Sequence, residues 1–208
     1  MNIFLPSDQL VPSMCLGTMD LSLYELVAAQ CIFANNGVYT KPTIIERIED
    51  RNGRVIYNAE QETEQVINSS VAYEILNLMS GVVQRGTGAS LRGSYNPWGG
   101  ITHPTAGKTG TTQGNAVGLF MGITPDLVTG VSTGGMFKEI AFEFTSDGQG
   151  ARMALPIYGY YMQKIYADKG IKISTEDFMK PSDYIPESFQ CDEDLLLPDE
   201  SNTEFGEF

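Results

Sequence analysis

Two stretches of the chain carry apolar residues at the spacing of a helix. The first begins at Ser22 and ends at Asn36-Gly37, and serine before a helix and glycine after it are typical of helix ends. We expect an amphipathic helix here, with its apolar side chains at Leu23, Leu26, Val27, Cys31 and Phe33. A second helix, capped by Asn68 or Ser69, is expected to run through Val83. Its apolar face would consist of Val71, Ile75, Leu76, Met79 and Val82.

Other stretches have the pattern of β-strands. Residues 44–57 combine alternating apolar and polar positions with the turn dipeptide Asn52-Gly53, and they predict a β-hairpin. After Gly86-Thr87-Gly88, which is expected to end the second helix, three strands should form an antiparallel meander. Their expected ranges are 105–112, 117–123 and 127–133, with Thr124-Pro125-Asp126 as the tight connection between the last two.

Residues 151–169 predict a helix that packs on this meander. Pro156 lies early in the segment and should shift or bend the start of the helix, because proline donates no backbone hydrogen bond. Its tyrosines, at positions 158, 160, 161 and 166, are interpreted as packing residues rather than as a cofactor site. The expected fold class is therefore α/β (α+β), with helices packed on an antiparallel sheet.

Charge divides the chain into two parts. The whole chain has 208 residues and a net charge of −13, but residues 181–208 alone hold nine acidic side chains and no lysine or arginine. The other 180 residues carry 13 basic and 17 acidic side chains, which gives no electrostatic footprint for nucleic acid or for anionic lipid. We expect a folded part over residues 1–170 and an acidic, disordered extension over residues 171–208. A partner-binding role for the extension is the alternative.

Several functional classes find no support in the sequence. No apolar run has the length of about 20 residues that crosses a bilayer, and the first residues lack the basic start of a secretory signal. Cys15, Cys31 and Cys191 have no metal-ligand or redox spacing, and they are interpreted as small apolar residues. His103 is the one histidine, so we expect no metal site and no cofactor.

The segment Ala106-Gly107-Lys108-Thr109-Gly110-Thr111-Thr112 carries the candidate chemistry. It places a cation, hydroxyl groups and an unobstructed glycine on one extended strand, which suits a ligand that carries a carboxylate. A phosphate-binding loop is disfavoured, because that motif needs glycine where Thr102 stands. A buried strand with an incidental lysine is the simplest alternative for the Lys-Thr-Gly triplet taken alone.

The residues around the Lys-Thr-Gly triplet favour a functional role over an incidental lysine. Residues 107–113, Gly-Lys-Thr-Gly-Thr-Thr-Gln, and residues 119–131, Leu-Phe-Met-Gly-Ile-Thr-Pro-Asp-Leu-Val-Thr-Gly-Val, resemble the transpeptidase domain of penicillin-binding proteins. The resemblance is greatest to the bifunctional (class A) enzymes, and the segment from Gly148 to Pro156 is most like those of the Bacteroides group. The resemblance to the transpeptidase domain covers roughly residues 10 to 170. Further segments that agree in order are residues 16–18, 33–39, 47–53 and 86–88.

The resemblance implies a partial domain. The family has a serine β-lactamase-like fold in which Ser-x-x-Lys supplies the nucleophile, Ser-x-Asn relays protons and Lys-Thr-Gly binds the substrate carboxylate. No lysine here has serine three residues before it, and Ser94-Tyr95-Asn96 lies too near Lys108 to match the second motif, so we interpret it as a coincidence. We therefore expect the C-terminal part of such a domain, inactive without the N-terminal half.

Roles follow from the resemblance for the residues of the strand. Lys108 and Thr111 would be catalytic: Lys108 places a positive charge over the site, and the Thr111 N–H forms half of the oxyanion hole. Thr109, Gly110 and Thr112 would bind the substrate. The implied ligands are the peptidoglycan stem peptide and β-lactams, which would lie along the strand as an added strand. The parent protein would work at the periplasmic face of the inner membrane, while this segment itself makes no membrane contact.

Two functional classes remain open at this point. The first is part of a peptidoglycan transpeptidase that becomes active when the nucleophile is supplied. The second is a non-catalytic remnant or a peptide-binding module without turnover.

Overall fold

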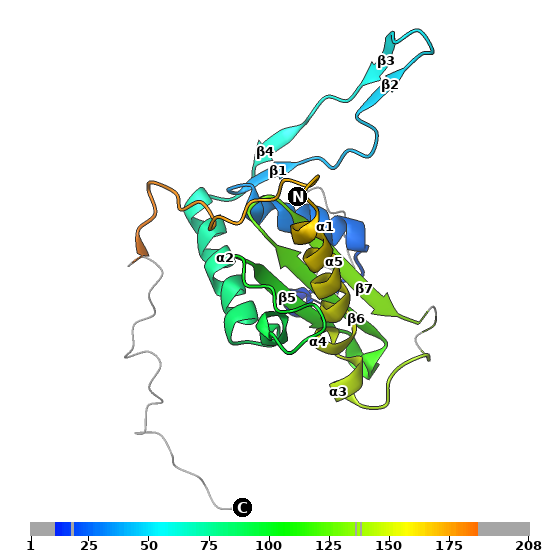
Figure 1. The fold of residues 1–208 in the computed structure, drawn as a ribbon, viewed down its shortest axis with the longest axis vertical. Helices are drawn as coiled ribbons and strands as arrows, with labels where there is room; N and C mark the ends of the chain where they lie inside the picture. Colours follow the sequence, from blue (N-terminus) through cyan, green and yellow to red (C-terminus); the bar gives the residue numbers. More distant parts are fainter. Residues whose placement is uncertain (1–10, 18, 136, 138, 187–208) are drawn as a thin grey trace, which may run out of the picture.

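A three-stranded antiparallel sheet forms the centre of the computed structural model, which describes residues 11–17, 19–135, 137 and 139–186 (Figure 1). Its strands are β5 (Ala106–Thr111), β6 (Val117–Ile123) and β7 (Val128–Gly134), in the order β5-β6-β7. The predicted meander is confirmed. Residues Thr124 to Leu127 make the tight turn between β6 and β7, and the Thr124 N–H donates to the carbonyl of Leu127 at 2.8 Å.

One face of the sheet is covered by the last helices of the chain. These are α4 (Gly150–Met153) and α5 (Leu155–Ala167), which follow the short helix α3 (Thr145–Gly148). The Tyr158 ring lies directly over Gly122 of β6, where a Cβ atom would come within 2.3 Å of it, and its centroid is 5.0 Å from that of Phe120. The helix expected over residues 151–169 is thus divided near Ala154, since Pro156 fits only in the first turn of α5.

The other face packs on α1 (Leu23–Ala34), which follows a short 3₁₀ helix, η2 (Pro12–Leu16). Ser22 caps α1 as expected, in a capping box with Glu25: the Ser22 hydroxyl accepts from the Glu25 N–H, and the Glu25 carboxylate accepts from the Ser22 N–H. The expectation of an amphipathic helix is not met. Only Ile32 is fully buried, and the apolar residues are spread around the helix and mostly half-buried.

Helix α2 (Ser69–Gln84) lies beside β5 and is capped by the Asn68 side chain. The predicted extent of α2 agrees closely with the structure, but the buried face is rotated about the helix axis from the predicted one. Val71 is 39% exposed, whereas Val83 is completely buried against Gly107 and Phe120. The side chains that α2 buries are Ala72, Leu76, Met79 and Val83. A 3₁₀ helix, η3 (Ala89–Arg92), follows.

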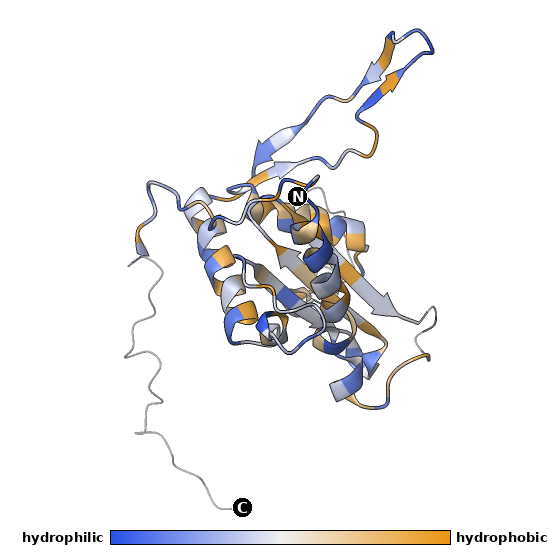
Figure 2. Cartoon of the chain, viewed as in Figure 1, coloured by the Kyte–Doolittle hydropathy of each residue, from blue (hydrophilic) through white to orange (hydrophobic). Residues whose placement is uncertain are grey.

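Two small antiparallel sheets stand apart from the central one. The predicted hairpin is confirmed as β2 (Arg47–Glu49) and β3 (Val55–Asn58) around the turn at Gly53, and it projects away from the body (Figure 1). Its apolar side chains are largely exposed and appear as the orange segments of the projecting arm in Figure 2. The pair β1 (Val38–Thr40) and β4 (Thr63–Gln65), which joins the hairpin to the body, was not predicted.

Part of the expected acidic extension packs on the body. Ser174 donates its N–H to the carboxylate of Asp126 at 2.7 Å, and the Tyr184 hydroxyl lies 2.5 Å from the carboxylate of Glu74. Phe178 packs into the apolar cluster beneath the sheet. The remaining residues of that extension, 187–208, lie outside the described residues. In the part of the chain that the structure describes, no helix has the length and apolar character to cross a membrane.

Candidate active-site strand

Strand β5 has one edge that no strand among the described residues pairs with. Thr112 donates its N–H toward β6, to the carbonyl of Val117 at 3.0 Å. Because successive residues of a strand direct their backbone groups to opposite edges, the N–H and C=O groups of Thr109 and Thr111 point to the unpaired edge. The Thr111 N–H, to which the family resemblance gives a role in the oxyanion hole, therefore faces outward.

Lys108 is exposed, and its side chain reaches this same edge. Its ammonium nitrogen donates to the carbonyl oxygen of Thr109 at 2.6 Å. An ammonium has three N–H donors, so this contact leaves donors for a ligand. Lys108 is consequently held where a negatively charged group on the strand edge would meet it.

Thr109 and Thr87 share a hydrogen bond. Their hydroxyl oxygens lie 2.7 Å apart. Thr87 belongs to the Gly86-Thr87-Gly88 turn, where a Cβ atom on Gly86 would come within 2.8 Å of the Val82 backbone. The missing side chain lets the turn fold back, and this brings Thr87 onto the strand.

Thr111 is held by the start of α4. The N–H of Gly150 donates to the Thr111 hydroxyl at 3.2 Å. A hydroxyl that accepts a hydrogen bond still has its own proton to donate, so this contact orients Thr111 without occupying its donor. Gly150 must be glycine, since a Cβ atom there would lie 2.4 Å from the Gly110 carbonyl and 2.2 Å from that of Leu119.

Gly110 and Thr112 each have a structural contact within the sheet, and their expected roles in substrate binding stay predictions. A Cβ atom on Gly110 would lie 3.1 Å from the Leu119 Cβ on β6, so packing within the sheet already favours a small residue there. The Thr112 hydroxyl accepts from the Val117 N–H at 2.9 Å, at the 3₁₀ turn η4 (Gln113–Asn115). The structure thus brings Lys108, Thr109 and Thr111 together at the edge and ties Thr112 into the β5–β6 connection.

Sequence reasoning missed Thr87 and Gly150 as supports of the strand. Both lie in glycine-containing segments that the sequence does mark, but their contacts span 22 and 39 residues of sequence. A local pattern gives no register for such distant pairs.

Other candidate chemistry has a structural explanation. Asn96, in the literal Ser-x-Asn triplet, donates its side-chain N–H to the Ser90 carbonyl at 2.6 Å, which ties down its own loop. Burial raises the pKa of the Cys31 thiol, so the thiol is protonated at neutral pH. Within the described ranges, no group of three His, Cys, Asp or Glu side chains could hold a metal ion.

Comparison with known proteins places the chain in a family. Residues 6–130, more than half of the chain, match the model of the penicillin binding protein transpeptidase domain. The chain is 34% identical over 196 residues to penicillin-binding protein 1A of Aquifex aeolicus, which covers 93% of this chain and 25% of the relative. It is 33% identical over 165 residues to penicillin-binding protein 1A of Neisseria gonorrhoeae, covering 76% and 19%. The chain thus spans about a quarter or less of these relatives.

Solved structures share the fold. The crystal structure of penicillin-binding protein 1A from Haemophilus influenzae superposes with a TM-score of 0.68 at 20% identity, over 82% of this chain and 30% of the other. The PonA1 protein from Mycobacterium tuberculosis, solved in complex with penicillin V, gives a TM-score of 0.67 at 25% identity, over 86% and 47%. The chain belongs to the penicillin-binding protein transpeptidase domain family.

Proposed function

We propose that this chain supplies the carboxylate-binding strand and half of the oxyanion hole of a peptidoglycan D,D-transpeptidase. The observation that carries the proposal is the arrangement at the unpaired edge of β5, where Lys108, Thr109 and Thr111 present a cation, two hydroxyls and an outward N–H within four consecutive residues. The PonA1 complex with penicillin V, in a protein of the same fold, supports β-lactams as ligands.

Each group at the edge has a definite task in this mechanism. The substrate, a stem peptide ending in a free carboxylate, adds to β5 as an extra strand. Lys108 attracts the carboxylate, while the hydroxyls of Thr109 and Thr111 donate hydrogen bonds to it. The Gly150 N–H donates to the Thr111 hydroxyl, which leaves the Thr111 proton to the ligand. In the Thr87–Thr109 pair either hydroxyl can be the donor, and in this mechanism Thr87 donates, which leaves the Thr109 proton to the ligand.

The Thr111 N–H stabilises the charge that develops during acyl transfer. The scissile carbonyl lies opposite Thr111, and its oxygen becomes negative when a nucleophile attacks. A donor that is already in place for this oxyanion contributes ~3 kcal/mol in other acyl transferases. The serine nucleophile and its base come from a polypeptide segment other than this chain, whose sequence contains no Ser-x-x-Lys.

The test compares ligands that differ only in the carboxylate. The chain is joined to a segment that carries Ser-x-x-Lys and Ser-x-Asn, and acylation is measured with a penicillin and with the analogue whose carboxylate is replaced by a carboxamide. We expect Thr109→Val and Thr111→Val each to slow acylation by the penicillin about ten-fold, the loss of one charge-assisted hydrogen bond. Acylation by the carboxamide should change little.

Thr129→Val on β7 is the matched control, since it makes the same chemical change on the same sheet away from the edge. It should leave both rates unchanged. A proportional loss with both ligands in the Thr109 and Thr111 variants would show that their hydroxyls only support the strand, and the assignment would fail.

The second candidate is a peptide-binding module without turnover. It is favoured by the one observation that the sequence carries the carboxylate-binding residues without the Ser-x-x-Lys pair. Reversible binding of a D-Ala-D-Ala peptide to the chain, without acylation after it is joined to the nucleophile segment, would select this candidate.

The cellular setting follows from the family assignment and belongs to the proposal. We place the parent protein at the periplasmic face of the inner membrane, with the stem peptide and the N-terminal half of its domain as partners. The special similarity to the Bacteroides group stays a prediction, because the relatives described above come from Aquifex and Neisseria.

A further inference from the structure

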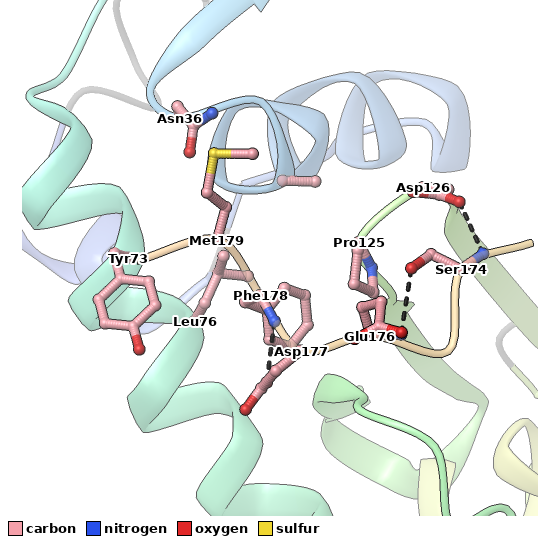
Figure 3. A pocket seen from close by; sticks show the side chains of 11 residues that line it. Asn36, Tyr73, Leu76, Pro125, Asp126, Ser174, Glu176, Asp177, Phe178 and Met179 are labelled. Atoms are coloured by element: carbon pink, nitrogen blue, oxygen red, sulfur yellow. Dashed lines mark hydrogen bonds between the residues drawn. The ribbon is translucent and has the colours of Figure 1, made fainter. Parts of the chain in front are cut away.

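A pocket of about 360 Å³ lies at the far end of β5 from Thr111. It is formed between α2, the turn after β6 and the C-terminal segment of residues 174–179, as Figure 3 shows. The turn begins directly after Ile123, which pairs with Ala106 at the first position of β5. The pocket is therefore separate from the candidate active-site strand, and its C-terminal wall lies beyond residues 6–130 that match the family.

The floor of the pocket is apolar and aromatic. Tyr73 and Leu76 come from α2, and Phe178 comes from the C-terminal segment (Figure 3). Leu76 is only 4% exposed and packs with Phe178 in the cluster beneath the sheet. Because this floor is fixed by core packing, the pocket is a preformed feature of the fold.

Three carboxylates line the pocket on the side of the turn and the C-terminal segment. They belong to Asp126, Glu176 and Asp177, and the lining contains no lysine or arginine. Asp126 accepts the Ser174 N–H and Asp177 accepts the Phe178 N–H, each with one oxygen. Within the described part of the chain, none of the three carboxylates forms an ion pair. Each carboxylate retains accepting capacity for a cation.

An aromatic ring next to the pocket already contacts a cation. The Lys180 ammonium lies 5.0 Å from the centroid of the Tyr184 ring, and that ring packs edge-to-face on Tyr73 at 5.0 Å. An aromatic floor with a carboxylate rim suits a side chain with an apolar stem and a cationic end. The pocket has the volume for one or two side chains rather than for a cofactor.

The charge of the C-terminal part of the sequence acts in the same direction. Residues 181–208, which come after the residues of the pocket wall in the sequence, carry nine acidic side chains and no basic one. The net charge of −13 on the whole chain raises the rate at which a positive partner arrives.

From these features we propose that the pocket binds a basic polypeptide segment of another protein, which inserts a lysine or arginine side chain together with an adjacent apolar residue. The apolar stem and the neighbour lie on Tyr73, Leu76 and Phe178, and the cationic end meets Asp126, Glu176 and Asp177. This binding is independent of the transpeptidase function proposed above.

The test uses the full 208-residue chain and short fluorescein-labelled peptides, with binding followed by fluorescence anisotropy. One peptide has a central Lys-Phe pair in a Gly-Ser background, and its relatives replace Lys by Glu or Phe by Gly. The variant Asp126→Asn, Glu176→Gln, Asp177→Asn removes the three pocket charges. Asparagine still accepts the hydrogen bonds from Ser174 and Phe178, so the fold of the segment is preserved.

The matched control removes three exposed charges elsewhere, with Glu46→Gln, Glu60→Gln and Glu64→Gln. We expect saturable binding of the Lys-Phe peptide, at least ten-fold weaker in the pocket variant and nearly unchanged in the control. Both altered peptides should bind at least ten-fold more weakly than the Lys-Phe peptide. Added salt should slow association more than it changes dissociation.

Four results would overturn the proposal. Equal weakening in the pocket and control variants would mean general attraction to an acidic chain, and equal binding of the Phe→Gly peptide would mean that the floor is not used. Absence of binding would exclude a basic segment as the occupant. A second copy of the chain could also occupy the pocket. In that case peptide binding would weaken as the protein concentration rises and the chain self-associates, and the occupant would be the chain itself.

Discussion

Single side chains at the edge of β5 depend on neighbours that lie far away in sequence. Lys108 bonds to the carbonyl of the next residue, whereas Thr109 and Thr111 are positioned by Thr87 and Gly150. These contacts fix the position of each hydroxyl oxygen before a ligand arrives. The cation and the donors therefore need little rearrangement on binding, which is the condition under which such groups contribute most.

Removal of the Lys108 ammonium should slow acylation strongly. In the chain joined to a nucleophile segment, we expect Lys108→Ala to lose ~1.5–3 kcal/mol of stabilisation, a decrease in β-lactam acylation rate of about one to two orders of magnitude. Lys108→Arg should recover only part of it, because the planar guanidinium keeps the charge but not the position of the ammonium. Lys164→Ala on α5 is the control. Equal rates for Lys108→Ala and the unmodified protein would reduce this lysine to a structural residue.

The buried hydroxyl of Tyr158 lowers the stability of the core. Its side chain is completely buried, its hydroxyl has no hydrogen-bond partner in the described structure, and burial raises its pKa well above the usual range. An unsatisfied buried hydroxyl costs about 1–3 kcal/mol. We expect Tyr158→Phe to keep the ring on Gly122 and to raise the midpoint of thermal unfolding by a few degrees, about 2–4 °C per kcal/mol in a chain of this size. A clear decrease would mean that the hydroxyl has a stabilising partner.

At the scale of elements, the sheet and helices approach each other closely wherever glycine stands at the contact. Gly122 admits the ring of Tyr158, and Gly150 lets the start of α4 rest on the backbones of β5 and β6. This second contact delivers the N–H that bonds to Thr111. The position of α4 and the geometry of the candidate site are thus coupled.

Two glycine substitutions should have opposite effects on stability. Gly150→Ala places a Cβ atom within 2.4 Å of two carbonyl oxygens, so α4 must move away from the sheet, and we expect a loss of several kcal/mol together with weaker ligand binding at β5. Gly81→Ala lies in the interior of α2 with nothing within 4 Å, and it should stabilise the chain by about 0.5–1 kcal/mol. Thermal unfolding of both variants measures this contrast. A neutral Gly150→Ala would show that α4 can shift freely.

At the scale of the whole molecule, the described residues leave sheet edges and apolar surface open. Strand β7, like β5, pairs only with β6. The projecting hairpin exposes Ile44, Ile56 and Tyr57 at 85%, 67% and 46% of their surfaces. Unpaired strands and exposed apolar patches both favour association with other polypeptide.

We therefore expect the isolated chain to self-associate. Light scattering coupled to gel filtration should show species larger than a monomer at micromolar concentration. If the hairpin contributes, Ile44→Thr with Ile56→Thr should reduce the mass without lowering the unfolding temperature, since both side chains lie outside the core. A monodisperse monomer with cooperative unfolding would instead show that this chain folds as a self-sufficient unit.

The isolated chain should form no covalent adduct with a penicillin. Its sequence has the carboxylate-binding strand but no serine three residues before a lysine, and an acyl-enzyme needs that activated nucleophile. Intact mass spectrometry after incubation with a penicillin provides the measurement. A stoichiometric mass increase would mean that another residue of this chain serves as the nucleophile.

The sequence by itself determined the local elements and the chemistry of one strand. The caps at Ser22 and Asn68, the hairpin turn at Gly53 and the three strands of the meander are all encoded by neighbouring residues, which is why their positions agree closely with the structure. The residues of the Lys-Thr-Gly segment were recognisable for the same reason. Their type and order indicate a carboxylate site before any fold is known.

Only the tertiary structure decided which surfaces these elements share. It turned Val83 rather than Val71 of α2 into the core, joined Thr87 to Thr109 and Gly150 to Thr111, and laid residues 171–186 over the body to form the acidic-rimmed pocket. The physical reason is that local sequence governs dihedral preference and hydrogen bonding within a turn or two. Contacts between distant segments depend instead on how whole elements fill the space around the sheet.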